Sequence, residues 1–271
     1  MLVALGLALA LLLVVVTGLL VVNLFQADIL FPVHAVPRAG PLPADAERLE
    51  LRLDGGERLH GVHFPPSALE AGPRTLIIGF GGNAWNGQDV ATYLHRVYPD
   101  SHVVAFHYRG YAPSTGSPSA EALKEDAPLV YDLAIERVRP TQTIAVGMSI
   151  GSGVAANLSR QRKLDGLIMV TPFDSLRRVA GDLFPWFPVG FFFQHELAAA
   201  DDLKHGNTPI AILAAERDGI VLPARTASLR QVPNVVFDRT FAGAGHNDVY
   251  QRSDFEAALR EALKSIIEAK K

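Results

Sequence analysis

The sequence predicts an α/β protein built on a mostly parallel, doubly wound sheet with an antiparallel start. After residue 74, short apolar runs follow one another, each bounded by glycine, proline or polar residues. Runs of this kind are typical of strands that are buried on both faces of a parallel sheet. Segments with helical spacing separate several of the runs, and alternation of strand and helix indicates a doubly wound architecture.

The antiparallel start is predicted in residues 47–64. The segment ERLELRLDGGERLHGVHF alternates apolar and polar residues on both sides of Asp54-Gly55-Gly56, which is the pattern of a hairpin. The predicted strands that follow are TLIIGF, HVVAFHY, TIAVGM, GLIMVT, PIAILAA and NVVFDRTF. The helical segments include residues 119–138, 153–164 and 253–270.

An unusually apolar segment precedes this domain. No charged residue occurs from Leu2 to Phe25, and as a helix the segment would be about 36 Å long, enough to cross a hydrocarbon core. A cleaved signal peptide is the competing interpretation, but the segment lacks a basic start and a clear cleavage site. We therefore expect residues 1–26 to be a transmembrane anchor and the protein to be a single-pass membrane protein.

The domain organisation follows from that expectation. A proline-rich connector is predicted over residues 27–45, and an α/β domain over residues 46–271. Arg38 alone carries a positive charge near the apolar segment, so the positive-inside rule leaves the side of the membrane undetermined.

Composition excludes several functions. The 271-residue chain has 25 Lys and Arg against 28 Asp and Glu, a formal net charge of -3, and no basic cluster, so nucleic acid is not expected as a partner. It contains no cysteine, which excludes disulfides, thiolate catalysis and Cys-ligated metals.

Ser149 is the candidate nucleophile. It lies in Gly147-Met148-Ser149-Ile150-Gly151, where the strand TIAVGM runs directly into a predicted helix. The pattern G-x-S-x-G in a tight strand-to-helix turn presents a serine above the carboxyl edge of the sheet. Small residues that only cap a helix would give the same pattern. Whether Ser149 is a nucleophile therefore depends on whether the chain also supplies a base and an acid for it.

The expected partners follow in the order acid, then base. Asp218 comes after the strand PIAILAA, and His246 comes after NVVFDRTF in a glycine-rich loop. All other histidines precede Asp218, which leaves His246 as the general base. Glu216, Asp248 and Asp201 compete with Asp218 for the role of the orienting acid.

An oxyanion hole needs backbone N–H groups that point to the developing negative charge. The residue after the nucleophile usually supplies one donor, which predicts the amide of Ile150. The loop Gly81-Gly82-Asn83-Ala84 follows the strand TLIIGF, and the amide of Asn83 is the second candidate.

These residues resemble the α/β-hydrolases, and within them the membrane-anchored group of the Bem46-like proteins and abhydrolase domain-containing protein 13. The resemblance covers most of the chain after the apolar segment. Its marks are the GGNAWN loop, the run YRGYAPSTGSPS at residues 108–119, the GMSIGSG turn, TPFDSL at residues 171–176 and GAGHND around His246.

Two positions depart from the family pattern. The family commonly has a His-Gly pair before the oxyanion-loop asparagine, where this chain has Gly81-Gly82. It commonly has Asp before the tyrosine-arginine-glycine run, where this chain has His107. The first departure bears on the set of oxyanion donors, and the second on the support of the loop.

The resemblance implies a serine hydrolase that cleaves an ester or thioester through an acyl-enzyme, without a metal or an organic cofactor. A serine peptidase or acyl-protein thioesterase is the alternative within the enzymes. A non-catalytic membrane scaffold with a hydrolase fold is the alternative outside them. Natural substrate and oligomeric state stay open.

A short cap is predicted at about residues 177–207. Its aromatic residues would line a pocket for a small-molecule or lipid-like acyl substrate, contact a bilayer, or pack onto the core. The candidate pocket residues are Phe184, Trp186, Phe187 and Phe191, with Phe192 and Phe193 beside them.

Overall fold

The computed structural model describes residues 2–67, 73–186 and 188–270. Its centre is an eight-stranded sheet in the order β1-β2-β4-β3-β5-β6-β7-β8. β1 pairs antiparallel with β2 and β2 antiparallel with β4, and the other pairings are parallel. The predicted fold class is thereby confirmed. The strands are β1 Glu47–Arg52, β2 Arg58–Phe64, β3 Thr75–Phe80, β4 His102–Phe106, β5 Gln142–Met148, β6 Gly166–Val170, β7 Ile210–Ala215 and β8 Val235–Phe241.

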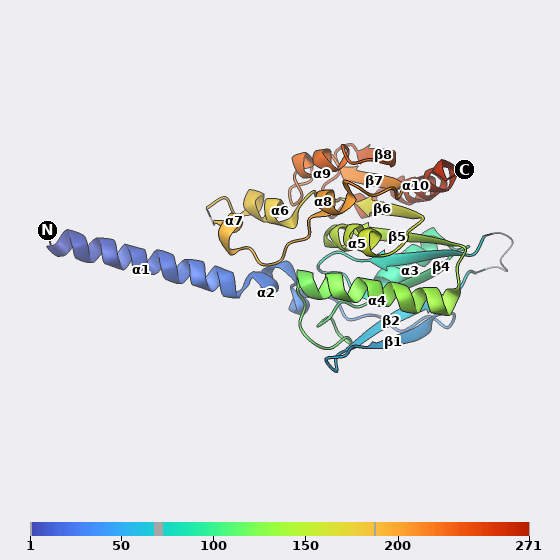
Figure 1. Cartoon of the computed structure of the whole chain (residues 1–271), viewed down its shortest axis with the longest axis horizontal. Coiled ribbons are helices and arrows are strands. Elements are labelled where there is room, and N and C mark those ends of the chain that lie inside the picture. The colour runs from blue at the N-terminus through green and yellow to red at the C-terminus, as the bar shows by residue number, and fades with distance from the viewer. Residues whose placement is uncertain (1, 68–72, 187, 271) are drawn as a thin grey trace.

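Helices cover both faces of the sheet, as Figure 1 shows. α3 and α10 contact one face and each other, whereas α4 and α5 pack together on the other. The helices of the domain are α3 Gly87–Val97, α4 Ala120–Val138, α5 Ile150–Gln161, α6 Leu176–Leu183, α7 Val189–Phe192, α8 Ala199–Leu203, α9 Pro223–Leu229 and α10 Phe255–Ala269. α5 begins at Ile150, directly after Ser149, where the strand-to-helix turn predicts its start.

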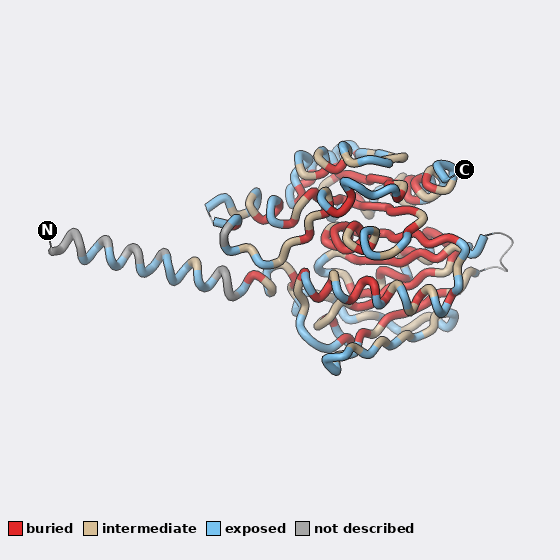
Figure 2. Tube along the Cα trace, viewed as in Figure 1, coloured by how far each residue is buried: buried red, intermediate tan, exposed pale blue. Residues whose placement is uncertain are grey.

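The central strands are apolar throughout because they are covered on both faces. β5 and β6 are buried along their whole length, as the red core of Figure 2 shows. One core cluster joins the sheet to α4 and α5, and a second joins it to α3 and α10. This rigid frame fixes the loops at the carboxyl ends of the parallel strands, where α/β proteins bind their ligands.

The apolar N-terminal segment forms the helix α1, Leu2–Leu24, which projects from the domain (Figure 1). Some of its side chains lie outside the described residues. Within the described part of the chain, no helix combines the length and apolarity that crossing a membrane requires. The helix itself is confirmed, but the predicted membrane span is not supported, and we correct that expectation here.

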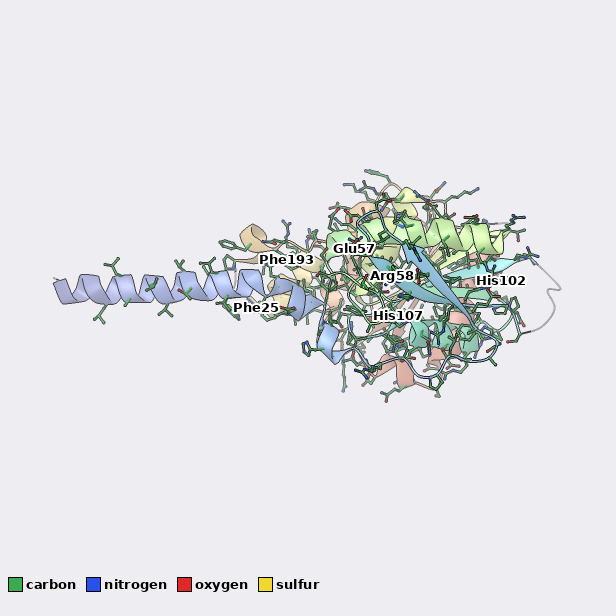
Figure 3. The ribbon with its side chains drawn as sticks, turned by 90° about the horizontal axis from the view of Figure 1, so that it is seen from below. Phe25, Glu57, Arg58, His102, His107 and Phe193 are labelled. Atoms are coloured by element: carbon green, nitrogen blue, oxygen red, sulfur yellow. The ribbon has the colours of Figure 1, made fainter. Side chains whose placement is uncertain are left out.

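A second short helix, α2 (Gln26–Leu30), connects α1 to the domain and is followed by the 3-10 turn η1 (Val33–Ala35). The Gln26 side chain is 5% exposed. Its Nε2 donates to the Phe192 carbonyl oxygen at 2.8 Å, and its Oε1 accepts from the Gln194 amide at 3.1 Å. α2 is therefore fixed against the segment between β6 and β7, near the labelled Phe25 and Phe193 in Figure 3.

Candidate active site

Ser149 lies at the turn between β5 and α5 in a backbone conformation that only glycine adopts easily. Its φ is 51° and its ψ is -117°. Such a positive φ in a non-glycine residue costs about 1–3 kcal/mol and persists only where the surrounding structure holds it. The turn places the hydroxyl above the carboxyl edge of the sheet, as the G-x-S-x-G pattern predicts.

The two flanking glycines are required by close packing. A Cβ on Gly147 would overlap the Gly151 carbonyl oxygen, and a Cβ on Gly151 would overlap the Phe80 carbonyl oxygen. The α5 N-terminus can therefore lie close to the end of β5 because Gly147 lacks a side chain, and close to the end of β3 because Gly151 lacks one. The pattern in the sequence therefore reports a steric need of the turn.

The structure brings Ser149, Asp218 and His246 together. His246 Nε2 lies 2.9 Å from Ser149 Oγ, and His246 Nδ1 lies 2.7 Å from Asp218 Oδ2. Asp218 is 5% exposed and His246 8%, so both interactions are largely shielded from water. Asp218 Oδ1 also accepts from the amides of Ile220 and Val221, at 2.9 and 2.7 Å, which fixes the carboxylate plane.

The competing acids contact other groups. Glu216 Oε2 accepts from the Gly243 amide at 2.7 Å, and Asp248 Oδ1 accepts from the Gly245 amide at 2.5 Å. Asp201 pairs with Lys204 at 3.3 Å on α8. Glu216 and Asp248 thus support the loop that carries His246, while Asp218 is the acid hydrogen-bonded to the imidazole.

The predicted oxyanion donors lie on the two loops beside the serine. Asn83 and Ile150 both line the cavity that contains Ser149 and His246. Among the residues that the structure describes, neither the Asn83 nor the Ile150 amide donates a hydrogen bond within the chain. Both N–H groups are thus free to bind a ligand oxygen.

Two tyrosines of the YRGY run hold the loop that carries Asn83. Tyr108 Oη donates to the Gly81 carbonyl oxygen at 2.7 Å, and Tyr111 Oη donates to the Asn83 carbonyl oxygen at 2.6 Å. Burial raises the pKa of both phenols, so both remain protonated donors. Sequence reasoning recognised this run as a family mark but assigned it no role, because the contact is tertiary.

Arg109, between the two tyrosines, anchors the same run to α4. Its guanidinium makes two hydrogen bonds to the Asp126 carboxylate, at 3.2 and 2.5 Å. Burial raises the pKa of Asp126, and the Arg109 charge opposes that shift. The paired geometry is the one in which Arg holds a carboxylate with most directional specificity.

A cavity of about 500 Å³ opens at Ser149. Its polar edge is formed by Ser149, His246, Asn83 and Asn247, and the rest of its wall is mainly apolar. The apolar part comes from α2, the loop after β3, the segment around α6 and the loop after β7, with Tyr250 beside them. This is the composition of a site that orients a small polar group and buries an apolar one.

The aromatic residues predicted to line the pocket lie in different places in the structure. Phe184 lines this cavity, whereas Trp186 and Phe193 line an adjacent one. Phe187 lies outside the described residues, as does the side chain of Phe191. Ile29 and Leu30 of α2 also line the cavity, and sequence reasoning missed them because the segment was interpreted only as anchor and connector.

No cofactor site was predicted, and the described ranges contain no group of three or more His, Asp or Glu side chains arranged to hold a metal ion. A hydroxyl, an imidazole and a carboxylate in sequence, with two free amides beside them, suit nucleophilic attack on a carbonyl carbon.

Comparisons with known proteins agree with this fold. No model of a known protein family matches the chain. The chain is 30% identical over 224 residues to an uncharacterized protein of Mycobacterium tuberculosis, and the match covers 78% of each chain. It is 30% identical over 222 residues to lysophosphatidylserine lipase ABHD12 of Xenopus tropicalis, covering 69% of this chain and 57% of that protein.

Similarity to solved structures adds the fold. An α/β-hydrolase of Vibrio vulnificus superposes with a TM-score of 0.68 at 18% identity, covering 90% of this chain and 92% of that one. An esterase of Pyrococcus furiosus superposes with a TM-score of 0.67 at 16% identity, covering 86% and 97%. Fold and site thus define an α/β-type hydrolase. The chain belongs to the abhydrolase domain-containing family of α/β-hydrolases.

Proposed function

We propose that the protein is a serine hydrolase that cleaves a carboxylic ester of a lipid-like acyl chain. One observation carries the proposal: His246 lies between Ser149 and Asp218, at 2.9 and 2.7 Å, at the polar edge of a mainly apolar cavity. A serine hydroxyl is a weak nucleophile until a base accepts its proton, and this arrangement supplies the base and orients it.

The first half-reaction forms an acyl-enzyme. Ser149 Oγ attacks the ester carbonyl carbon while His246 Nε2 takes the hydroxyl proton. The negative charge moves to the carbonyl oxygen, which faces the amides of Asn83 and Ile150. The C–O bond to the alcohol then breaks, and His246 returns the proton to the departing alkoxide. Asp218 holds the imidazole tautomer and stabilises the imidazolium between these steps.

The second half-reaction releases the acid. A water molecule enters where the alcohol was, and His246 removes one of its protons as the oxygen attacks the acyl carbonyl. The bond to Ser149 Oγ breaks and the serine recovers its proton from His246. One ester and one water are thereby converted into one carboxylic acid and one alcohol.

The substrate class is argued from the cavity and the relatives. The apolar wall favours an acyl group without polar substituents. ABHD12 proteins of frog and zebrafish, 30% and 32% identical to this chain, are lysophosphatidylserine lipases, which supports a lipid-like ester. The chain spans less than two thirds of these lipases, so the proposal extends to the acyl ester and not to a particular head group.

A fluorophosphonate probe tests the proposal, because it phosphonylates only activated serines. We expect wild-type protein to be labelled, Ser149→Ala to be unlabelled, and His246→Ala to be labelled far more slowly. Ser159→Ala, which removes a hydroxyl from the last turn of α5, is the matched control and should be labelled as the wild type is.

Labelling at another serine, or none in folded wild-type protein, would contradict the proposal and favour a non-catalytic role for the fold. If labelling is positive, comparison of acyl esters with acyl-peptide thioesters and peptides would separate the esterase from a thioesterase or peptidase. The mainly apolar cavity wall favours the acyl ester over an extended peptide.

A further inference from the structure

A second cavity of about 250 Å³ lies beside the catalytic one. The two share a wall, to which α2 contributes Ile29 and Leu30 and the α6 segment contributes Ala180 and Phe184. The second cavity continues away from Ser149 toward the junction of α1 and the domain, where Phe25 and Phe193 lie (Figure 3). Together the cavities extend from the serine past Ile29 and Leu30 of α2 to Gln26.

The walls of the second cavity suit a ligand without polar groups. Apart from Gln26, its lining is apolar or aromatic and includes Trp186, Val189 and Phe193. The Gln26 amide is already used, since it bonds the Phe192 carbonyl oxygen and the Gln194 amide. A polar ligand atom would lose its hydration there without a partner, whereas methylene groups would gain about 0.8 kcal/mol each by leaving water.

Polar and apolar groups are therefore separated along the two cavities. The hydroxyl of Ser149, the imidazole of His246 and the free amides lie at one end, and only apolar surface lies at the other. This polarity matches a molecule with a carbonyl at one end and a long hydrocarbon chain behind it. A short acyl group would leave the second cavity empty.

We propose that the second cavity is a distal acyl subsite, which binds the far end of an unbranched acyl chain whose carbonyl carbon lies at Ser149. The inference rests on the proposed function for the position of the carbonyl. Phe184 is a specificity-determining residue of this arrangement together with Ile29, Leu30 and Ala180, because these four residues form the wall common to both cavities. α2 completes the subsite from the N-terminal side.

The two tryptophans of the chain allow the position of an acyl chain to be read directly. Trp85 lines the catalytic cavity, and Trp186 lines the second one. A bromine atom quenches tryptophan fluorescence at contact distance. Hexadecanoic acid carrying bromine at carbon 2 or at carbon 16 therefore reports which end lies at which tryptophan, when the Trp85→Phe and Trp186→Phe proteins are measured separately.

We expect 16-bromohexadecanoate, below its micellar concentration, to quench Trp186 in the Trp85→Phe protein. We expect 2-bromohexadecanoate to quench Trp85 in the Trp186→Phe protein, and the reverse combinations to show little quenching. Absence of quenching at Trp186 by the terminal bromine, or equal quenching by both isomers, would overturn the assignment. The measurement at Trp186 is made in the Trp85→Phe protein, in which every residue lining the second cavity is unchanged.

A substitution that fills part of the second cavity tests the subsite independently of the quenching measurement. Val189 lines only the second cavity, so Val189→Phe should narrow it without altering the surroundings of Ser149. We expect hexadecanoate to bind at least tenfold more weakly and octanoate to bind as before, because only the longer chain loses buried methylenes. Val33→Phe, at a position 39% exposed and in neither cavity, is the matched control.

Equal effects of Val189→Phe on both chain lengths, in protein that retains the wild-type melting temperature, would contradict the subsite. Binding of the free acids does not depend on hydrolysis, so the two proposals can fail separately. Absence of fluorophosphonate labelling with quenching of Trp186 intact would refute the hydrolase alone. Labelling without that quenching would refute the subsite alone.

Discussion

The Gln26 side chain donates a hydrogen bond from Nε2 to the Phe192 carbonyl oxygen at 2.8 Å, across 166 positions of sequence. Its Oε1 accepts from the Gln194 amide at 3.1 Å, so one buried amide satisfies two backbone groups. Buried polar groups that lose a partner cost free energy, which makes this residue a connection between α2 and the cap segment.

Gln26→Ala should lower the free energy of unfolding by about 1–3 kcal/mol, since it leaves both backbone groups unpaired. Hydrogen exchange of the amides in residues 189–194 should become faster, which mass spectrometry can measure. Gln231→Ala, at an exposed position, is the control and should change neither quantity. Unchanged exchange in the Gln26 variant would show that α2 does not hold the cap.

Asp218→Asn should reduce kcat/KM for an acyl ester by about 10⁴-fold, because an amide stabilises the wrong imidazole tautomer and does not balance the imidazolium charge. Glu216→Gln is the matched control. It removes a charge two residues away, from a side chain that bonds the Gly243 amide. A loss of similar size in Glu216→Gln would contradict the assignment of the orienting role to Asp218.

Gly151→Ala should destabilise the protein by about 1–3 kcal/mol or more, because its Cβ would overlap the Phe80 carbonyl oxygen in a packed region. Gly181→Ala is the opposite case. Gly181 lies inside α6 with no atom near its added Cβ, so alanine should stabilise by about 0.5–1 kcal/mol. Chemical denaturation measures both, and equal effects would contradict the steric account of the turn.

Burial lowers the pKa of His107 from 6.5 to about 4, although Asp89 opposes the shift. In the unfolded chain, His107 therefore becomes protonated as the pH falls below 6.5. In the folded protein, it becomes protonated only at about pH 4. The contribution of neutral His107 to the free energy of unfolding is present above pH 6.5 and is lost as the pH falls from 6.5 to about 4. The total loss is about 3 kcal/mol.

Denaturation of wild type and His107→Gln between pH 7 and pH 4 measures this contribution. The difference between the two curves should change by about 3 kcal/mol across the interval, because the variant has no proton to take up there. His205→Gln, at an exposed position, should follow the wild-type curve. Parallel curves for wild type and His107→Gln would contradict the prediction.

The parallel sheet could be predicted from the sequence because each buried strand is a continuous apolar run. The positions of Ser149, Asp218 and His246 could be predicted because the fold orders nucleophile, acid and base at the ends of successive strands. Both signals are local or topological. They depend on composition and order and not on how distant segments pack.

The parts that were missed depend on tertiary contacts. The five residues of α2 carry no periodic signal, and Ile29 and Leu30 reach the cavity because tertiary contacts, among them those of Gln26, fix the helix against the domain. The roles of Tyr108 and Tyr111 follow from hydrogen bonds to carbonyl oxygens 27 and 28 residues away. Apolarity of residues 2–25 indicated a helix correctly, but the inferred membrane span is not supported.

The place of α2 in the cavity wall determines how the protein can be shortened for study. Deletion of α1 up to Leu24 would keep both sides of the wall, whereas a chain starting at Pro32 would lose Gln26, Ile29 and Leu30 together. A sample trimmed in the second way would keep Ser149, Asp218 and His246 but would lack the side of both cavities that α2 forms. Ligand screens on such a sample would therefore report on cavities that differ in shape from those of the whole protein.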